Sequence, residues 1–433
     1  MPKDVTVFLV THDFATDARS GGGQRTMLFF EAAKKVARTE VIVLGINDRP
    51  GLRESFRDPA AFHFVKQTGF PERASSRLRR VAATIRRLAG IRRGFAPDPQ
   101  LRRDIEALAH RPGLSVFLVR YAYPFMKMGM VSDPAAGRLI AVDLDDLDDR
   151  KYETESRRRF GTLFTQAVMG PLVLTPLHRM LSRGLRGAST TWVCAQDDAR
   201  AYPGITSQIV PNVPYAPSSS ALMGPGFPAP STAGDVLFVG SARHLPNQHG
   251  IEWFLKNCWP ALGNRFFDCR LRIVGNGDWG FLRERFSHLD RVHFGGSVPD
   301  LATEYAGARL AISPVSLGAG TKIKVVEACA YGRPVVVTSH SARGFEREFA
   351  GHMAVADSPQ DFIDACARLL SDPAWADTTG AELQAAQTVH FSFDAATAKI
   401  AADLRAMIDA HDPDHAVSRP EIPARLVKNE VTT

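Results

Sequence analysis

The sequence predicts an α/β protein made of two doubly wound domains, each built on a parallel sheet. Short runs of Val, Leu and Ile alternate with helical patterns along the chain, which is typical of strands buried on both faces. The 433 residues are enough for two domains of about 200 residues each. Between the two halves, residues 216–234 are rich in Pro, Ser, Gly and Ala, a composition that favours a linker.

The predicted boundaries follow from this pattern. We expect an amino-terminal domain over 1–215, a linker over 216–234, a carboxy-terminal domain over 235–394, a last helix over 395–411, and a disordered tail over 412–433. The predicted strands are Val5–Val10, Val41–Leu44, Val116–Val119, Leu139–Val142 and Thr191–Ala195 in the first domain, and Val236–Val239, Leu271–Val274, Val292–Phe294, Leu310–Ser313 and Val335–Val337 in the second.

Composition places the chain among ordinary soluble proteins, with 45% hydrophobic and 23% charged residues. No apolar run reaches the roughly 18 residues of a membrane helix, and the first ten residues show no signal-peptide pattern. The five cysteines form no C-x-x-C pair, which favours reduced core thiols in a cytoplasmic protein. The net charge of +7 suits an anionic ligand or membrane surface without specifying either.

Two segments of the first domain are strongly basic. Residues 77–93 carry seven arginines on an amphipathic helical pattern, which fits either a surface helix packed on the sheet or docking onto anionic lipid. Nucleic acid is not expected, because no aromatic residues for base stacking are interleaved with the arginines. Residues 151–188 also read as helical, basic and surface-lying.

The stretch from Pro314 to Thr338 is the strongest signal for a site. Gly318 and Gly320 allow a tight backbone turn, and Thr321 is the expected N-cap of the helix that follows. Lys322 and Lys324 add positive charge at that helix start, so the segment suits a phosphate or diphosphate.

Glu327 is the one carboxylate in this otherwise apolar helix. A solvated glutamate on an exposed face is the ordinary reading, but the helix has little polar face left. We therefore favour a buried carboxylate that needs a partner.

The segment Glu327–Val336 resembles the E-A-x-A-x-G-x-P-V-V signature of family 4 glycosyltransferases of the GT-B fold. Residues 246–254 resemble the P-N-x-x-G-x-x-W-F run of one branch of that family, and residues 209–213 its I-P-N-G-V segment. Ala319 departs from the common pattern, which has a second glutamate at that position. The resemblance extends strongly over 236–345 and loosely over 1–215.

The resemblance implies a retaining transferase that needs no metal and no cofactor, with a nucleotide sugar as donor and a saccharide or lipid-linked acceptor. It implies that Glu327 holds the ribose, while Arg243, Lys322 and Lys324 stabilise the leaving diphosphate. The donor-binding residues that it implies are Gly21, Gly22, Gly23, Gly240, Asn247, Gly275, Gly277, Gly318, Gly320, Thr321 and Glu327. From the residues alone, the Gly21–Gly23 segment is equally readable as a tight turn.

The acceptor side is expected at the ends of two strands of the first domain, at Arg120, Asp145 and Asp146. Five aspartates between 143 and 149 would suit a hard cation, but their spacing is not that of an EF-hand. A solvated acidic loop remains an alternative to an acceptor-orienting carboxylate.

Other functions stay open at this point. A sugar-nucleotide epimerase and a non-catalytic relative share the fold. The G-x-G-x-x-G pattern at 275–280 is a weak NAD signal, because no acidic residue ends the following strand. The compartment expected is the cytoplasm, with peripheral attachment to the inner face of a membrane through 77–93.

Overall fold

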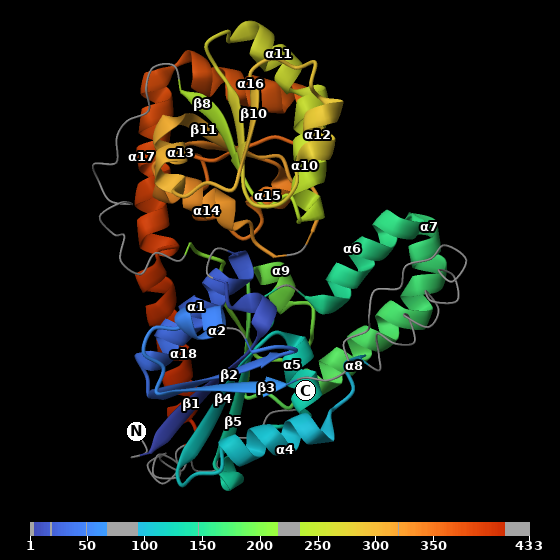
Figure 1. Cartoon of the computed structure of the whole chain (residues 1–433), viewed down its shortest axis with the longest axis vertical. Helices are drawn as coiled ribbons and strands as arrows, with labels where there is room; N and C mark the ends of the chain where they lie inside the picture. The colour runs from blue at the N-terminus through green and yellow to red at the C-terminus, as the bar shows by residue number, and fades with distance from the viewer. Residues whose placement is uncertain are drawn as a thin grey trace, which may run out of the picture.

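The computed structural model describes residues 4–17, 20–48, 50–66, 94–145, 147–214, 234–318 and 320–411. These residues form two α/β domains, with the amino-terminal domain below and the carboxy-terminal domain above in Figure 1. The two doubly wound domains predicted from the sequence are confirmed. The predicted basic helix 77–93, the tail 412–433 and almost all of the predicted linker lie outside the described residues.

Within those residues, the amino-terminal sheet has seven strands in the order β3-β2-β1-β4-β5-β6-β7, and every pair is parallel. Its centre is fully apolar, and Val7–Val10 of β1 are 0% exposed because helices cover both faces. The strands are β1 (Val5–His12), β2 (Arg38–Gly45), β3 (Ala61–Lys66), β4 (Leu114–Arg120), β5 (Arg138–Asp143), β6 (Thr190–Val193) and β7 (Ser207–Ile209).

The strands predicted for this domain are present, but β3 and β7 were not predicted. They are the two edge strands, and most of their residues are half-buried. His63 also interrupts the apolar pattern of β3. The helices are α1 (Gly21–Lys34), α2 (Pro50–Glu54), α4 (Pro99–Leu108), α5 (Ala122–Met128), α6 (Asp148–Phe160), α7 (Thr162–Phe164), the π-helix η3 (Thr165–Leu174), α8 (Thr175–Leu185) and α9 (Gln196–Ala199), with short 3-10 turns η1 (Asp13–Ala15) and η2 (Pro134–Ala136).

The glycines Gly21–Gly23 form the first turn of α1 rather than a loop before it. The side chain of Ser20 caps this turn by accepting a hydrogen bond from the backbone N–H of Gly23 at 3.1 Å. The interpretation of these glycines as a tight turn is therefore wrong. Because Ser20 caps the helix, α1 begins at Gly21, six residues before Met27, the first apolar residue of the predicted helical pattern.

The carboxy-terminal sheet has six parallel strands in the order β10-β9-β8-β11-β12-β13 among the described residues. They are β8 (Asp235–Val239), β9 (Leu271–Val274), β10 (Val292–Gly296), β11 (Ala308–Ser313), β12 (Val335–Val337) and β13 (Ala354–Val355). The helices are α10 (Leu245–Asn257), α11 (Trp259–Arg265), α12 (Gly280–Arg285), α13 (Leu301–Gly307), α14 (Ile323–Ala330), α15 (Ser339–Ala342), α16 (Pro359–Ser371), α17 (Pro373–His390) and α18 (Phe393–Asp409).

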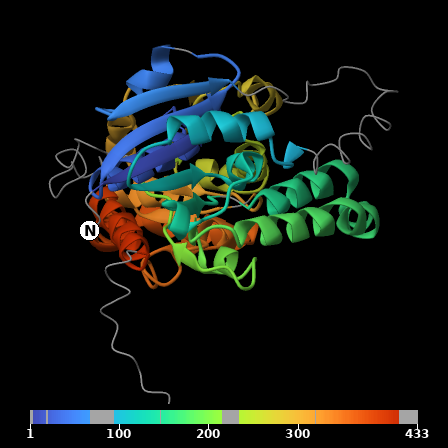
Figure 2. The same ribbon diagram turned by 90° about the horizontal axis from the view of Figure 1, so that it is seen from below.

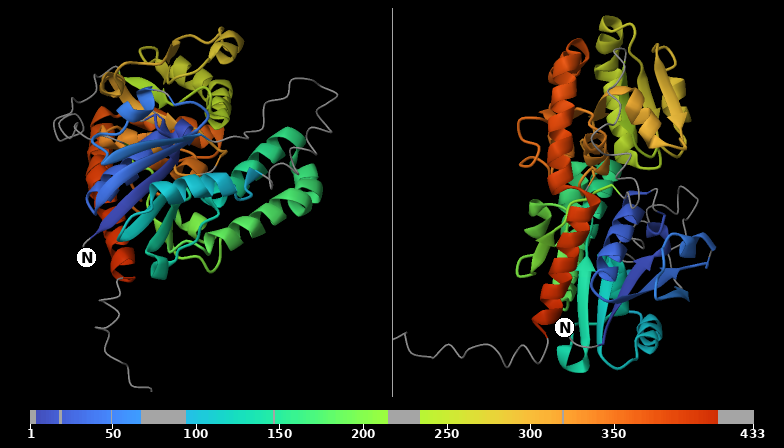
Figure 3. Two further views of the ribbon diagram at one scale, coloured as in Figure 1. Left: turned by 60° about the horizontal axis from the view of Figure 1, so that its bottom comes forward. Right: turned by 90° about the vertical axis from the view of Figure 1, so that its left-hand side faces the viewer.

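Helices α17 and α18 run along one side of both domains (Figures 1 and 3). Helix α18 packs on α1 of the first domain, where Lys35 Nζ lies 2.7 Å from Thr397 Oγ1. Trp192 Nε1 donates to Asp403 Oδ2 at 3.0 Å. One cluster of buried hydrophobic residues continues from the first sheet through this helix into the second domain, so the chain's end fixes the two domains together. No helix in the described part of the chain is long and apolar enough to cross a bilayer.

Candidate active site

The candidate site lies between the domains, where the carboxyl ends of both sets of strands meet. There the backbone N–H of Asn212 donates to Thr321 Oγ1 at 3.1 Å, and Arg343 Nη2 lies 3.4 Å from Asp198 Oδ1. In open α/β sheets, ligands bind at this edge because the strand ends and the following helix starts leave backbone groups pointing outward. Figure 1 shows α14 of the upper domain above α1 of the lower one.

The starts of α1 and α14 approach each other across this edge. A Cβ built on Gly21 would lie 3.9 Å from Ile323 Cδ1. A Cβ built on Gly22 would lie 2.5 Å from the hydroxyl oxygen of Tyr121, so a larger residue at 22 would displace that ring. The first turn of α1 can therefore approach the predicted diphosphate segment closely, because its glycines have no side chains in the way.

The segment before α14 has the backbone that the sequence predicts, with one correction. Gly318 and Gly320 have φ of 101° and 67°, in the region that favours glycine. Thr321 is not the N-cap, because α14 begins at Ile323 and its N-cap is Lys322. The side chain of Lys322 makes no capping hydrogen bond to the first turn of the helix. The Thr321 hydroxyl instead accepts from Asn212 of the other domain. Lys322 Nζ donates to the carbonyl of Gly320 at 3.0 Å, bracing the turn.

Lys324 reaches from α14 to the end of β8. Its Nζ donates to Asn247 Oδ1 at 2.6 Å and lies 4.2 Å from the centre of the Phe238 ring. A Cβ on Gly240 would lie 2.9 Å from the same nitrogen, so the glycine makes room for the lysine. Burial, together with the charge of Lys322, lowers the pKa of Lys324 to about 7.

Glu327 is buried, as we favoured from the sequence, with 7% of its surface exposed, so the solvated reading is wrong. Its Oε2 accepts from the Tyr305 hydroxyl at 3.1 Å, and the Tyr305 ring stacks on Tyr331 with centroids 4.5 Å apart. Burial raises the pKa of Glu327 to about 7, although the Tyr305 bond and the charge of Lys324 oppose that rise.

Two further glycine turns border Lys324. Gly275 and Gly277 have φ of 140° and 98°, and a Cβ on Gly275 would lie 2.0 Å from the carbonyl oxygen of Gly240. The turns after β8 and β9 are therefore pressed together, which only glycines permit. Arg243 is exposed, and its Cγ would lie 3.0 Å from a Cβ on Gly277. This arginine is thus placed on the rim of the site rather than inside it.

The two described acceptor-side residues, Arg120 and Asp145, are both buried and contact each other. Arg120 is fully buried and donates to Thr26 Oγ1, to the Gly22 carbonyl and to Asp145 Oδ2, at 3.1, 3.2 and 3.3 Å. We therefore read Arg120 as a residue that positions its neighbours. Burial raises the pKa of Asp145, but Arg120 and Arg25 outweigh it and lower that pKa to about 2. Asp146 lies outside the described residues.

A second buried arginine, Arg25, was missed by the sequence analysis. Its guanidinium binds Asp143 through a 2.6 Å bond from Nη2 and the Val210 carbonyl through a 2.7 Å bond from Nη1. It also donates to Asn212 Oδ1 at 3.1 Å, so it ties α1, β5 and the segment after β7 beneath the site. The available signal was a lone cation in the apolar run of α1, the same kind of signal that singled out Glu327.

His340 of α15 was also missed. It is half-buried beside the Gly318 turn, and burial with the charges of Lys322 and Arg343 lowers its pKa to about 4. Among the described residues, its buried Nε2 has no hydrogen-bond partner. A neutral imidazole beside a lysine and an arginine adds a polar group to this side of the site without adding charge.

A family model described as Glycosyl transferases group 1 matches residues 233–372, which hold all of these carboxy-terminal groups. Residues 233–372 are a group 1 glycosyltransferase domain. The predicted resemblance is thereby confirmed for this domain. A curated Klebsiella pneumoniae protein, named "Uncharacterized 44.6 kDa protein in cps region", is 27% identical over 131 residues. That match covers 28% of this chain and 34% of the relative's length.

Solved structures resemble the whole chain. Sucrose-phosphate synthase from Thermosynechococcus elongatus has a TM-score of 0.61 at 14% identity, covering 94% of this chain and 100% of that one. Anabaena HepE, solved with UDP and glucose, has a TM-score of 0.60 at 15% identity, covering 93% and 99%. These likenesses show that the fold is GT-B, as the sequence predicts.

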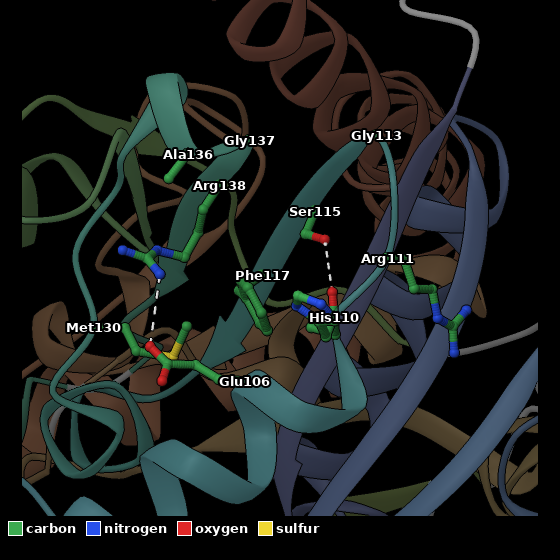
Figure 4. A pocket seen from close by; sticks show the side chains of 11 residues that line it. Glu106, His110, Arg111, Gly113, Ser115, Phe117, Met130, Ala136, Gly137 and Arg138 are labelled. Carbon is green, nitrogen blue, oxygen red and sulfur yellow. Dashed lines mark hydrogen bonds and ion pairs between the residues drawn. The ribbon is translucent and has the colours of Figure 1, made fainter.

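A cavity of about 390 Å³ lies elsewhere on the amino-terminal domain (Figure 4). It is lined by Glu106, His110 and Arg138 among others, at the end of the sheet where β4 and β5 begin. Arg120 and Asp143 end these same strands, so the cavity lies at the opposite edge of the sheet from the candidate site. We assign it no part in the site.

Proposed function

We propose that this protein transfers a sugar from a nucleotide-sugar donor to a saccharide or lipid-linked acceptor. The observation that carries the proposal is the set of groups around the start of α14. The cap residue Lys322 braces the Gly320 turn, Lys324 binds Asn247 of α10 and acts on the charge of Glu327, and the first turn of α1 approaches from the opposite domain. Glycosyl transfer needs the negative charge of the leaving diphosphate to be stabilised, and these groups supply cations and helix starts there.

The donor's diphosphate is placed on the Gly318–Lys324 segment. Lys324, with a pKa near 7 in the free protein, gains an anionic partner when the diphosphate binds, which favours its charged form. Arg243 on the rim can close over the same group. These cations are the reason that we propose transfer without a metal ion. The HepE structure was solved with UDP and glucose, and we propose a nucleoside diphosphate sugar for this chain also.

Glu327 is proposed to hold the ribose hydroxyls. Its position four residues after Ile323 places it one turn deeper in α14 than the phosphate segment. Tyr305 fixes one carboxylate oxygen, so the side chain is oriented before the donor arrives. A carboxylate that accepts from hydroxyls makes charge-assisted bonds, which are stronger than neutral ones.

Asp145 is proposed to orient the acceptor. It is ionised at any physiological pH because Arg120 and Arg25 hold its pKa at about 2. Such a carboxylate can accept a hydrogen bond from an acceptor hydroxyl, but it is too weak a base to remove the proton alone near neutral pH. This fits the retaining, front-face transfer implied by the resemblance, in which the leaving diphosphate takes the acceptor proton.

The cellular setting that we propose is the synthesis of a surface polysaccharide or glycoconjugate. The supporting observation is the match to a Klebsiella pneumoniae protein that is named for the cps region. The chain would work in the cytoplasm, at the inner face of the membrane if its acceptor is lipid-linked.

Release of nucleoside diphosphate from a nucleotide sugar, measured with and without acceptor, tests the proposal. A transferase releases diphosphate much faster with acceptor present. An epimerase converts the nucleotide sugar into its epimer with no net release of diphosphate, and a non-catalytic relative binds the donor but changes neither the sugar nor the diphosphate. UDP-glucose and acceptor extracted from the source membrane are suitable first probes.

A further inference from the structure

Helices α6, α7 and α8, together with η3, form a hairpin that projects from the amino-terminal domain; we call residues 148–185 the arm. It stands away from both sheets in Figures 1 and 2. Its limbs are joined by a bond of 3.0 Å between the hydroxyls of Ser156 and Thr165, and the rings of Phe160 and Phe164 pack with centroids 5.2 Å apart. The arm is therefore an ordered structural element.

The far end of the arm exposes large hydrophobic side chains. Leu163 is 83% exposed, Leu172 69% and Phe164 41%. Leu163 and Phe164 lie in α7 at the turn of the hairpin, and Leu172 lies further along η3, which packs on both α7 and α6. From residue 160 to residue 177 the sequence contains no charged side chain. Such a patch on a projecting element points to an interaction partner.

Behind this apolar end the arm is cationic overall. Residues 148–185 hold six arginines and one lysine against four acidic residues, and all four acidic residues lie in α6. Arg179 and Arg183 on the returning limb are exposed, while the exposed Arg157 of α6 pairs with Glu153 at 2.6 Å. The partner should therefore offer an apolar layer behind an anionic one, which is the order of groups in an anionic lipid bilayer.

We propose that the end of the arm inserts into the headgroup region of an anionic lipid bilayer. Leu163, Phe164 and Leu172 enter the boundary of the acyl chains, while the arginines behind them bind lipid phosphates. A second copy of the chain fits this surface poorly, because joining two arms would bring like charges together. A bilayer accepts exposed apolar side chains without needing a shaped pocket.

The base of the arm adjoins the acceptor side of the site. Helix α6 begins at Asp148, close after the acidic segment that contains Asp145. Lys151 Nζ of α6 lies 5.5 Å from the centre of the Tyr121 ring, next to Arg120. Docking through the arm would hold this side near the bilayer, where a lipid-linked acceptor is found. Only this last step rests on the proposed function.

Vesicle flotation with the full chain tests the proposal. We expect binding to vesicles of phosphatidylcholine with phosphatidylglycerol, weaker binding to phosphatidylcholine alone, and release by salt. The triple variant Leu163→Gln, Phe164→Gln, Leu172→Gln should bind at least about tenfold less. The matched control is Phe267→Gln, Phe281→Gln, Val389→Gln, which removes equally exposed side chains from the other domain and should bind as the wild type does.

A second readout places the contact. All five native cysteines are buried, so a Thr162→Cys variant can be labelled at the exposed end of the arm with an environment-sensitive dye. The dye should shift to the blue on vesicle binding and be quenched by a lipid-borne quencher. UDP-glucose affinity, measured in parallel without vesicles, should be unchanged in the triple variant. That affinity separates failure of the docking proposal from failure of the proposed function.

Four results would overturn the proposal. Two of them are wild-type vesicle binding by the triple variant and a dye at position 162 that does not respond to lipid. Loss of binding only on changing Arg79, Arg80, Arg86 and Arg87 to Gln would instead assign the membrane contact to residues 77–93. A wild-type dimer that becomes a monomer in the triple variant would assign the arm to a second copy of the chain.

Discussion

The affinity for a nucleotide sugar should fall as pH rises through neutrality, because of Lys324. Its pKa is about 7 in the free protein, and a bound diphosphate raises that pKa, so the complex holds more protons than the free protein does. The protonated fraction of free Lys324 falls about 25-fold between pH 6.5 and 8.5 for a pKa of about 7, and this change alone should lower the affinity by about the same factor.

Isothermal titration with UDP-glucose across this pH range measures the effect. The diphosphate of a nucleotide sugar does not titrate in this range, so the protein supplies any change. Glu327 also has a pKa near 7, and Lys324→Arg is the control because it keeps a positive charge at every pH while leaving Glu327 in place. The difference between the two profiles isolates Lys324. A flat wild-type profile, or an equal fall in Lys324→Arg, would refute the reasoning.

Three other substitutions test neighbouring parts of the site. Glu327→Gln should keep the fold and weaken donor binding by about 1.5–3 kcal/mol, so an unchanged dissociation constant would remove it from the site. Lys324→Ala should lower turnover about a hundredfold, because it removes a cation that stabilises the leaving diphosphate. Lys322→Ala removes the bond that braces the Gly320 turn, so it should mainly lower the melting temperature. Equal effects of the two substitutions on turnover and on melting temperature would contradict this division. Gly22→Ala should impair activity by displacing the Tyr121 hydroxyl, and adding Tyr121→Phe should restore it; failure of the rescue would mean that the glycine serves a ligand instead.

The features predicted correctly from the sequence are those that neighbouring residues along the chain determine. The valine run at 335–337 forms β12, Gly332 has the positive φ of a helix stop, and Glu327 proved to be buried because its helix has no polar face. The donor segment could be located because glycines and lysines bracket a helix start within a few residues. Each of these features depends on neighbours in the sequence.

The features that the sequence did not predict depend on contacts between residues that lie far apart along the chain. The Thr321 hydroxyl accepts a hydrogen bond from Asn212 of the other domain, and the helix begins one residue later than predicted. Arg25 finds its carboxylate partner at Asp143, in a strand far along the chain. Helical structure was predicted over 151–188, but the projection of α6 to α8 as an arm depends on packing that local periodicity does not encode.

The central claim is that the carboxy-terminal domain holds a nucleotide sugar at the start of α14. A thermal-shift screen of nucleoside diphosphate sugars against the wild type and Lys324→Met tests it most directly. A donor present at a hundred times its dissociation constant should stabilise the wild type by about 2.7 kcal/mol and the variant far less. Equal stabilisation of both proteins, or of neither by any nucleotide sugar, would contradict the account.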